Sequence, residues 1–438
     1  MQINTVTIIG ANGAIGSKIG GLLAAFTDAR IFMMARSIES AQRGVKKAMS
    51  SIRSSVVEKK LIPCTLEQAE EILGESDWVF ESVVEELQVK KSIYAMIDSY
   101  AATNCIVTTG TSGISVNALA EAFSEQRRRN FWCTHFFNPP MKLTACEIIK
   151  SKYSDASRVD EFNQFLEKSL CRTIVPINSD RAAFAGNYVG FRLFEMAANS
   201  CEQNADKGGI DYVDYVLGNA AGNTMAPMTT LDYVGLDVYQ SIVENIHDNV
   251  PAAPGKTSGF IRQLIQNGFT GKKKLQGLYD YTTGTSTAPP VWDLRDFAYR
   301  PAKKYNIAEI ECVREFVRHG RYEKILPHLL CVDSNESHIV LSYILSYILH
   351  SFELIPDVVS DIRHVDAVMM YGFAWAPPTF WLSQIARLTQ KNAFTALCEK
   401  FDVILSQNVL ANINTYIEND EAPDDGGFRY FAVDGNSQ

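Results

Sequence analysis

The first residues that could do chemistry together are a histidine and a glutamate. His135 lies near the end of the apolar run 131–137, and Glu147 follows it by twelve residues at the start of the run 147–150. A Pro-Pro pair stands between them, so a turn could bring the two strand ends together. A histidine titrates near neutral pH and can accept a hydroxyl proton while a hydride leaves the same carbon. A carboxylate beside it would hold the tautomer and stabilise the imidazolium. The alternative is a histidine that only packs in an apolar strand.

A glycine-rich turn near the start of the chain could bind a dinucleotide. The sequence GANGAIG follows the apolar run 6–9, a predicted strand, and precedes a helical pattern over 17–26. Glycines let the backbone approach a pyrophosphate, and a helix N-terminus adds oriented N–H groups. The spacing has one residue more than the usual G-x-G-x-x-G, and a purely structural turn can also use glycines. The candidate cofactor contacts in this turn are Gly10, Asn12, Gly13, Ala14, Ile15 and Gly16.

The end of the second predicted strand, 30–34, bears on the choice of dinucleotide. NAD sites usually place an acidic residue there to bind the ribose 2′-hydroxyl. Here the chain continues with Ala35, Arg36 and Ser37, and the first carboxylate is Glu39. An arginine followed by a serine suits a 2′-phosphate, although Arg36 could also be a solvated loop residue. We therefore expect NAD as the cofactor, with NADP as an open alternative that Arg36 and Ser37 would bind.

The elements that must position these residues alternate between strand and helix in the first part of the chain. Further strands are predicted at 78–80 and 106–109, and helices at 39–60, 86–100 and 116–124. This alternation predicts an α/β domain with a parallel sheet covered by helices, and after about residue 180 long helical patterns dominate. Residues 281–305 have a loop composition, and the acidic tail from Glu418 is expected to fray.

Composition narrows the function classes. The chain has 438 residues, a formal net charge of -9 and nine cysteines without a C-x-x-C pair. The acidic balance disfavours nucleic acid as a partner, and the cysteines indicate neither a disulfide framework nor a metal site. The sequence contains no apolar run of the ~18 residues that cross a bilayer. We expect a cytoplasmic protein with no membrane partner.

The helical part contains a faint internal repeat. Asp214 is followed by Gly222 and, thirteen residues after the aspartate, by Pro227. Asp366 is followed by Gly372 and, twelve residues after the aspartate, by Pro378. Two helical segments could also share such a turn by chance.

Taken together, these motifs resemble those of the L-3-hydroxyacyl-CoA dehydrogenase family. The stretches that carry the resemblance are the glycine-rich turn, DWVFESVVEELQVK (77–90), GTS (110–112), HFFNPP (135–140) with Glu147, FAGN (184–187), MAP (225–227), LDYVGLD (231–237) and GKKKLQGLY (271–279). Residues 305–420 resemble the degenerate second helical copy of the long family members. The resemblance implies an α/β Rossmann domain with a doubly wound, mostly parallel sheet at 1–180, followed by all-α C-terminal domains. These are a helical dehydrogenase domain at 181–290 and a degenerate helical repeat with an acidic tail at 291–438.

The resemblance also implies roles for individual residues. His135 would be the general base and Glu147 its orienting partner, while Ser112 and Asn187 would hydrogen-bond the substrate oxygen. Glu85 and Lys90 match family positions near the cofactor and the acyl-CoA. The implied reaction is hydride transfer between NAD(P) and C3 of a 3-hydroxyacyl or 3-ketoacyl thioester, as in β-oxidation. No metal would be needed, since the nicotinamide carries the redox step. We expect a monomer or homodimer without a preceding hydratase domain.

The departures from the family pattern keep two alternatives open. The extra residue in the turn and Ala35 at the family's aspartate position put cofactor choice in doubt, and Gly110 and Tyr188 replace the family's Asn and Arg. The substrate could instead be a carrier-bound or free 3-hydroxy acid, or the chain could be a non-catalytic member. Acyl-CoA phosphates need a basic surface, for which Lys90-Lys91 is one candidate and a solvated charged face the alternative.

Overall fold

The computed structural model describes residues 1–418 except 51, 53, 250–256, 284–287 and 389–392. The chain divides into two compact units, which are described separately. The first contains residues 1–184 together with 357–359, and the second contains 185–356 together with the chain from 360 onward. The division into three domains that the sequence predicts, with a boundary at 290, stays a prediction.

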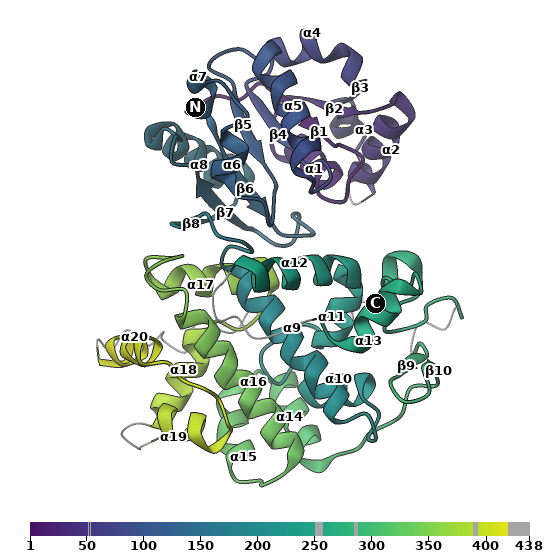
Figure 1. The fold of residues 1–438 in the computed structure, drawn as a ribbon, viewed down its shortest axis with the longest axis vertical. Helices are drawn as coiled ribbons and strands as arrows, with labels where there is room; N and C mark the ends of the chain where they lie inside the picture. The colour runs from purple at the N-terminus through teal and green to yellow at the C-terminus, as the bar shows by residue number, and fades with distance from the viewer. Residues whose placement is uncertain (51, 53, 250–256, 284–287, 389–392, 419–438) are drawn as a thin grey trace. The chain divides into compact units, whose positions relative to one another are not determined.

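The first unit is built on one eight-stranded sheet (Figure 1, purple to blue). Its order is β3 (Leu61–Thr65), β2 (Arg30–Ala35), β1 (Thr5–Ile9), β4 (Trp78–Glu81), β5 (Ile106–Thr109), β6 (Phe131–Phe136), β7 (Ala145–Lys150) and β8 (Thr173–Ile177). All neighbouring strands are parallel except β6 and β7. The chain winds outward from β1 in both directions, which confirms the predicted doubly wound Rossmann fold.

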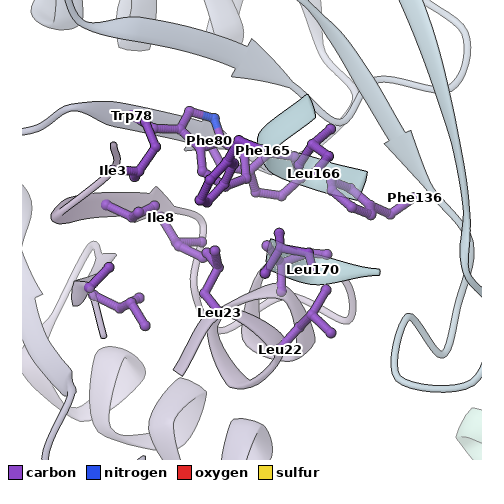
Figure 2. Packing of buried hydrophobic residues seen from close by; sticks show 14 of the residues in the cluster. Ile3, Ile8, Leu22, Leu23, Trp78, Phe80, Phe136, Phe165, Leu166 and Leu170 are labelled. Atoms are coloured by element: carbon purple, nitrogen blue, oxygen red, sulfur yellow. The ribbon is translucent and has the colours of Figure 1, made fainter. Parts of the chain in front are cut away.

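Buried apolar strands and helices form the core of this unit. All five residues of β1 are buried, as expected for a central strand covered on both faces. Figure 2 shows Leu22 and Leu23 of α1 (Gly16–Phe26) near Leu170 of α8 (Ala156–Leu170), with Trp78 of β4 in the same cluster. The other helices of the unit are α2 (Ile38–Met49), α3 (Ser55–Glu58), α4 (Ala69–Gly74), α5 (Leu87–Tyr100), α6 (Val116–Ala120) and α7 (Glu125–Arg128).

The predicted helix over 39–60 is wrong in its second half. The helix α2 ends at Met49, and α3 begins anew after Ser54, whose side chain accepts a hydrogen bond from the N–H of Val57 at 3.4 Å. Residues 51 and 53 of the predicted helix lie outside the described residues. The missed strand β3 follows at the edge of the sheet, where the proline in its LIPCT sequence is tolerated because an edge strand needs fewer backbone donors. Sequence reasoning also missed β8 and α8.

The second unit is almost entirely helical (Figure 1, teal to yellow). Its helices are α9 (Gly186–Gln203), α10 (Ile210–Leu217), α11 (Pro227–Val234), α12 (Leu236–Asn249), α13 (Gly259–Gln266), α14 (Ala308–Arg318), α15 (Ile325–Leu330), α16 (Asn335–Phe352), α17 (Ile362–Val368), α18 (Pro378–Ala386), α19 (Ala393–Lys400) and α20 (Gln407–Glu418). The antiparallel pair β9 (Val291–Asp293) and β10 (Ala298–Arg300) interrupts the predicted loop 281–305, whose residues 284–287 lie outside the described part. The predicted acidic tail begins at Glu418, the last residue of α20, and the rest of it, 419–438, lies outside the described part as well.

The internal repeat has a structural counterpart in two helix caps. Asp214 accepts hydrogen bonds from the N–H groups of Met228 and Thr229, both at 2.8 Å, in the first turn of α11. Asp366 accepts one from the N–H of Thr379 at 3.2 Å in the first turn of α18. The hydroxyls of Thr229 and Thr379 donate to the same carboxylates at 2.7 and 2.6 Å. Both aspartates therefore satisfy the free N–H groups of a helix that starts with proline.

The turns before α11 and α18 also contact each other. The N–H of Ala376 donates to the carbonyl of Gly222 at 3.0 Å, and the indole of Trp381 donates to the carbonyl of Ala221 at 3.1 Å. A Cβ at Gly222 would lie 2.3 Å from the Ala376 side chain. The two segments of the repeat thus pack as mutual partners within one unit.

Candidate active site

The turn between β6 and β7 brings His135 and Glu147 together. The two strands are antiparallel and pair these residues directly. The imidazole Nδ1 lies 2.7 Å from Oε2 of Glu147, and the two residues are 6% and 0% exposed. The buried guanidinium of Arg172 donates to the carbonyls of Pro140 and Leu143 at 2.6 and 3.2 Å, which holds the turn closed. A carboxylate only accepts hydrogen bonds, so the proton of the neutral ring lies on Nδ1.

The other ring nitrogen of His135 faces Ser112. Its Nε2 lies 3.0 Å from the serine hydroxyl, in the loop after β5. With the ring proton on Nδ1, Nε2 is an acceptor and the hydroxyl is the donor. The three residues therefore form a continuous line of hydrogen bonds from Glu147 through His135 to Ser112. This arrangement can take a proton from an alcohol at Nε2 and stabilise the resulting imidazolium.

Glu85 holds the loop that carries Ser112. One oxygen, Oε1, accepts hydrogen bonds from the N–H groups of Ser112 and Gly113, both at 3.0 Å, and from the hydroxyl of Thr111. Its other oxygen, Oε2, lies 3.2 Å from the ammonium of Lys90. Burial raises the pKa of Glu85, but Lys90 and the hydrogen bonds of the loop outweigh this effect and leave the pKa below its usual value.

Lys90 is buried, at 1% exposure, so the prediction that it contributes to a basic surface is wrong. Its ammonium lies 2.9 and 3.1 Å from the two carboxylate oxygens of Glu81, the last residue of β4. Burial lowers the pKa of Lys90, but the charges of Glu81 and Glu85 raise it by more. The net shift of the pKa is therefore upward. Lys90 is therefore charged, and its charge is balanced by carboxylates on both sides.

Sequence reasoning missed Glu81. The residue is 0% exposed and also accepts hydrogen bonds from the hydroxyls of Tyr94 and Thr109, both at 2.7 Å. The signal that could have found it is an acidic residue closing the buried strand WVFE, nine residues before a lysine on the next helix. A carboxylate in such a position needs a cation, because burying an unpaired charge is strongly unfavourable.

The glycine-rich turn has the shape that a pyrophosphate requires. Gly10 follows β1 with φ +88°, and a Cβ there would lie 2.3 Å from the carbonyl oxygen of Ser82. Gly16 begins α1, and its Cβ would lie 2.6 Å from the carbonyl oxygen of Gly10. No side chain caps the N-terminus of α1, and no acidic residue stands in its first turn. The backbone N–H groups can therefore face an anionic ligand, so the turn fits a dinucleotide.

The remaining residues of the turn and the β2 end lie close to this helix start. Asn12 and Ile15 are partly buried and Ala14 is exposed, and the carbonyl of Asn12 accepts a hydrogen bond from Lys47 at 2.8 Å. Ser37 caps α2 by accepting a hydrogen bond from the N–H of Ser40 at 3.3 Å. Its hydroxyl thus has a structural task that sequence reasoning did not foresee.

Arg36 and Asn187 complete the set of predicted site residues. Arg36 is exposed one residue after β2, and within the described part of the chain it makes no ion pair. Asn187 is the second residue of α9 in the second unit and is buried at 7% exposure. Its predicted role at the substrate oxygen stays a prediction, as do the roles of the other site residues.

Comparison with known families identifies this arrangement. Residues 5–180 match the model of the 3-hydroxyacyl-CoA dehydrogenase NAD binding domain, and residues 184–281 match that of the C-terminal domain of the same family. The chain belongs to the 3-hydroxyacyl-CoA dehydrogenase family. The NAD binding domain of this family supports NAD(H) as the cofactor, in agreement with the open glycine turn and the uncapped start of α1.

Curated relatives carry the family's names. A Bacillus subtilis protein described as a probable 3-hydroxyacyl-CoA dehydrogenase is 28% identical over 347 residues, which are 77% of this chain and 42% of that protein. The human mitochondrial hydroxyacyl-coenzyme A dehydrogenase is 29% identical over 301 residues, covering 64% of this chain and 91% of that protein. The chain spans only 42–55% of the length of the Bacillus protein and of two Rickettsia relatives.

Solved structures of the 3-hydroxyacyl-CoA dehydrogenase family share the fold. The 3-hydroxybutyryl-CoA dehydrogenase of Escherichia coli K12 superposes with a TM-score of 0.62 at 16% identity, covering 92% of this chain and 99% of that one. The dehydrogenase part of multifunctional enzyme 1 from C. elegans gives a TM-score of 0.53 at 16% identity, covering 94% and 90%. These likenesses extend the shared fold beyond residue 281, where the match to the C-terminal family model ends.

Among the described residues, no helix is both long and apolar enough to cross a membrane. No cluster of three or more metal-ligating side chains occurs among them either.

Proposed function

We propose that the protein is an NAD(P)-dependent dehydrogenase of 3-hydroxyacyl thioesters, which interconverts the 3-hydroxy and 3-keto forms as in fatty acid oxidation. The observation that carries this proposal is the position of His135, whose two ring nitrogens contact Glu147 at 2.7 Å and Ser112 at 3.0 Å. A base that is oriented on one side and faces a neutral hydroxyl donor on the other is what oxidation of a secondary alcohol requires.

In the proposed mechanism the substrate hydroxyl approaches Nε2 of His135. This nitrogen accepts the hydroxyl proton, and the carboxylate of Glu147 stabilises the imidazolium that forms. A nicotinamide, when bound at the glycine-rich turn, would supply the hydride acceptor. When the substrate hydroxyl takes the place of Ser112 at Nε2, the Ser112 hydroxyl turns to donate its hydrogen bond to the substrate oxygen. Asn187 is proposed as a second donor. In the reverse direction His135 returns the proton to the oxygen that gains charge as the ketone is reduced.

The end of β2 supports a role for NADP(H) beside NAD(H). Residues 35–37 contain no carboxylate that would bind a 2′-hydroxyl and repel a 2′-phosphate. Arg36 is exposed and has no ion-pair partner among the described residues, so its guanidinium can pair with a phosphate. Arg43 and Lys47, one turn apart on α2, add further positive charge on the helix that follows.

The proposed substrate is an acyl-CoA, the class of compound named in the descriptions of the Bacillus subtilis and human relatives. A carrier-bound or free 3-hydroxy acid would use the same catalytic residues, since the reacting carbon is identical. The three substrates differ only in the group beyond the carbonyl.

The test is a reduction assay with acetoacetyl-CoA that follows nicotinamide absorbance with NADH and with NADPH in separate reactions. We expect the wild type to reduce the substrate and the His135→Ala variant to show no turnover. Parallel reactions with a carrier-protein thioester and with free acetoacetate identify the substrate class. Absence of turnover with every pair of cofactor and substrate would contradict the proposal and favour a non-catalytic member. Turnover that survives in His135→Ala would contradict the assigned base.

A further inference from the structure

A buried charge network lies behind the loop that carries Ser112. Glu81 is 0% exposed and Lys90 is 1% exposed, and their charged groups are joined at 2.9 and 3.1 Å. Two hydroxyls complete the surroundings of Glu81, those of Tyr94 and Thr109, each at 2.7 Å. The N–H of Val83 donates to Oε1 of Glu81 at 2.7 Å. The carboxylate of Glu81 thus has hydrogen bonds to four different residues in the interior.

Glu85 extends this network to the surface of the site. Lys90 lies 3.2 Å from one oxygen of Glu85, and the other oxygen accepts the N–H groups of Ser112 and Gly113 at 3.0 Å. The ammonium cannot move to solvent, because the whole side chain is buried. The position of Lys90 therefore limits where the Glu85 carboxylate can lie, and that carboxylate limits where the Ser112 loop can lie.

We propose that Glu81 is a positioning residue for the reaction, which acts through Lys90 and Glu85 to hold Ser112 within hydrogen-bond distance of His135. This inference rests on the proposed function, and it adds a residue whose side chain contacts neither ring nitrogen. Without the carboxylate of Glu81, the buried ammonium has Glu85 as its remaining carboxylate. It then draws Glu85 inward, away from the N–H groups of the loop.

The strength of this coupling follows from charge. Hydrogen bonds to ionised groups are shorter and about twice as strong as neutral ones. A carboxylate that accepts two backbone N–H groups and a hydroxyl on one oxygen fixes three consecutive residues, 111–113. A displacement of about 1 Å in a reacting group can lower the rate by about 100-fold. A buried residue three contacts away from Ser112 can therefore affect turnover without touching substrate.

The first experiment measures the loop without using activity. Backbone hydrogen exchange of residues 110–115 is compared in the full-length wild-type protein, in Glu81→Gln and in Tyr94→Phe. Tyr94→Phe removes only a hydroxyl that donates to Glu81, so this variant replaces Glu81→Gln in the comparison if Glu81→Gln does not fold. The matched control is Tyr347→Phe, because Tyr347 is equally buried at 0% exposure and its hydroxyl also donates one 2.7 Å hydrogen bond, in the helical unit.

Exchange at 112 and 113 is expected to rise in both variants of the network and to stay unchanged in Tyr347→Phe. The loop N–H groups lose their acceptor only when Glu85 shifts. Unchanged exchange in a folded Glu81→Gln, or in Tyr94→Phe where Glu81→Gln does not fold, would overturn the proposal. This measurement stands even if the wild type shows no hydride transfer, which would contradict the proposed function alone.

The second experiment is a double-mutant cycle with Ser112→Ala. Glu81→Gln is expected to lower kcat by about 10- to 100-fold in the wild-type background. Tyr94→Phe is expected to lower it by about three- to tenfold, the effect of one hydrogen bond. In the Ser112→Ala background either change should cost less than about twofold, because the group that Glu81 positions is already absent. Equal losses in both backgrounds would mean that the network supports the fold in general, and would overturn the positioning role.

Discussion

Replacing Glu147 with glutamine keeps the shape of the side chain and removes its charge. The carboxylate lies 2.7 Å from the imidazole of His135 and is 0% exposed, so solvent does not screen the interaction. Hydrogen bonds to charged groups contribute about 1.5–3 kcal/mol. Because this bond strengthens as the imidazolium forms, its loss falls mainly on the transition state. At 1.36 kcal/mol per factor of ten, kcat should fall by about 10- to 150-fold.

The tautomer adds to this effect. The amide of a glutamine can donate to Nδ1, which would move the ring proton to Nε2, the nitrogen that faces Ser112 at 3.0 Å. An imidazole that already carries its proton on Nε2 cannot accept the substrate proton at that nitrogen. The analogous change in a serine protease lowers kcat by about 10⁴-fold, so 10- to 150-fold is a lower bound. The KM for the thioester should change little, because Glu147 is buried behind the imidazole.

The assay is steady-state reduction of acetoacetyl-CoA with the preferred cofactor. Thermal unfolding of the same preparation shows whether the variant is folded. Glu121→Gln is the control, since this glutamate is 54% exposed and its ion pair is with the surface residue Lys152. A folded Glu147→Gln variant with a kcat within threefold of the wild type would refute the reasoning. A variant in which KM rises while kcat stays unchanged would refute it as well.

Three further outcomes are expected. Arg36→Glu should raise the KM for NADPH by at least about tenfold, since one charge-assisted bond is lost and a repulsion added, and leave that for NADH nearly unchanged; equal changes for both cofactors would exclude a contact with the 2′-phosphate. Gly10→Ala should abolish dinucleotide binding in a fluorescence titration and lower the free energy of unfolding by at least about 1 kcal/mol, because φ is +88° and a Cβ would meet a carbonyl oxygen at 2.3 Å. Gly259→Ala is its control, with no atom within 4 Å of the added Cβ. Burial raises the pKa of Glu195 from 4.5 to about 7, so the folded state retains a proton that the unfolded state loses, and the free energy of unfolding falls as pH rises from 4.5 to 7. At 1.36 kcal/mol per pKa unit, Glu195→Gln should therefore stabilise the protein above pH 7 by about 3 kcal/mol in urea titrations and far less near pH 4.5. The exposed Glu202→Gln should not; a gain independent of pH would contradict the charge argument.

Local patterns in the sequence were sufficient for the main architecture. Apolar runs such as VTII, followed by a glycine turn and a helical pattern, predict a strand, a turn and a helix from nearest-neighbour physics alone. The predicted sheet was confirmed at its central, buried strands. The prediction failed at the edge strands β3 and β8, in each of which a proline hides the strand signal. It also failed at β9 and β10, which are three residues long and pair with each other.

Some features of the candidate site could likewise be predicted from the sequence, and others could not. The spacing of His135 and Glu147 across a Pro-Pro turn was readable because antiparallel neighbours in one hairpin face each other. The contact of Ser112 with His135 joins the loop after β5 to β6, across 23 positions of sequence. The resemblance to a family indicated Ser112 as a site residue, but the contact itself was not predicted.

What the sequence alone determined is the set of elements and the residues able to transfer a proton, because periodicity, turn residues and side-chain chemistry are local properties. What only the tertiary structure decided is which charges meet in the interior. Lys90 looks like half of a surface Lys-Lys pair in the sequence, yet it is buried between Glu81 and Glu85. A buried charge depends on partners that the packing of β4, α5 and the loop after β5 brings within about 3 Å, and no local pattern encodes that distance.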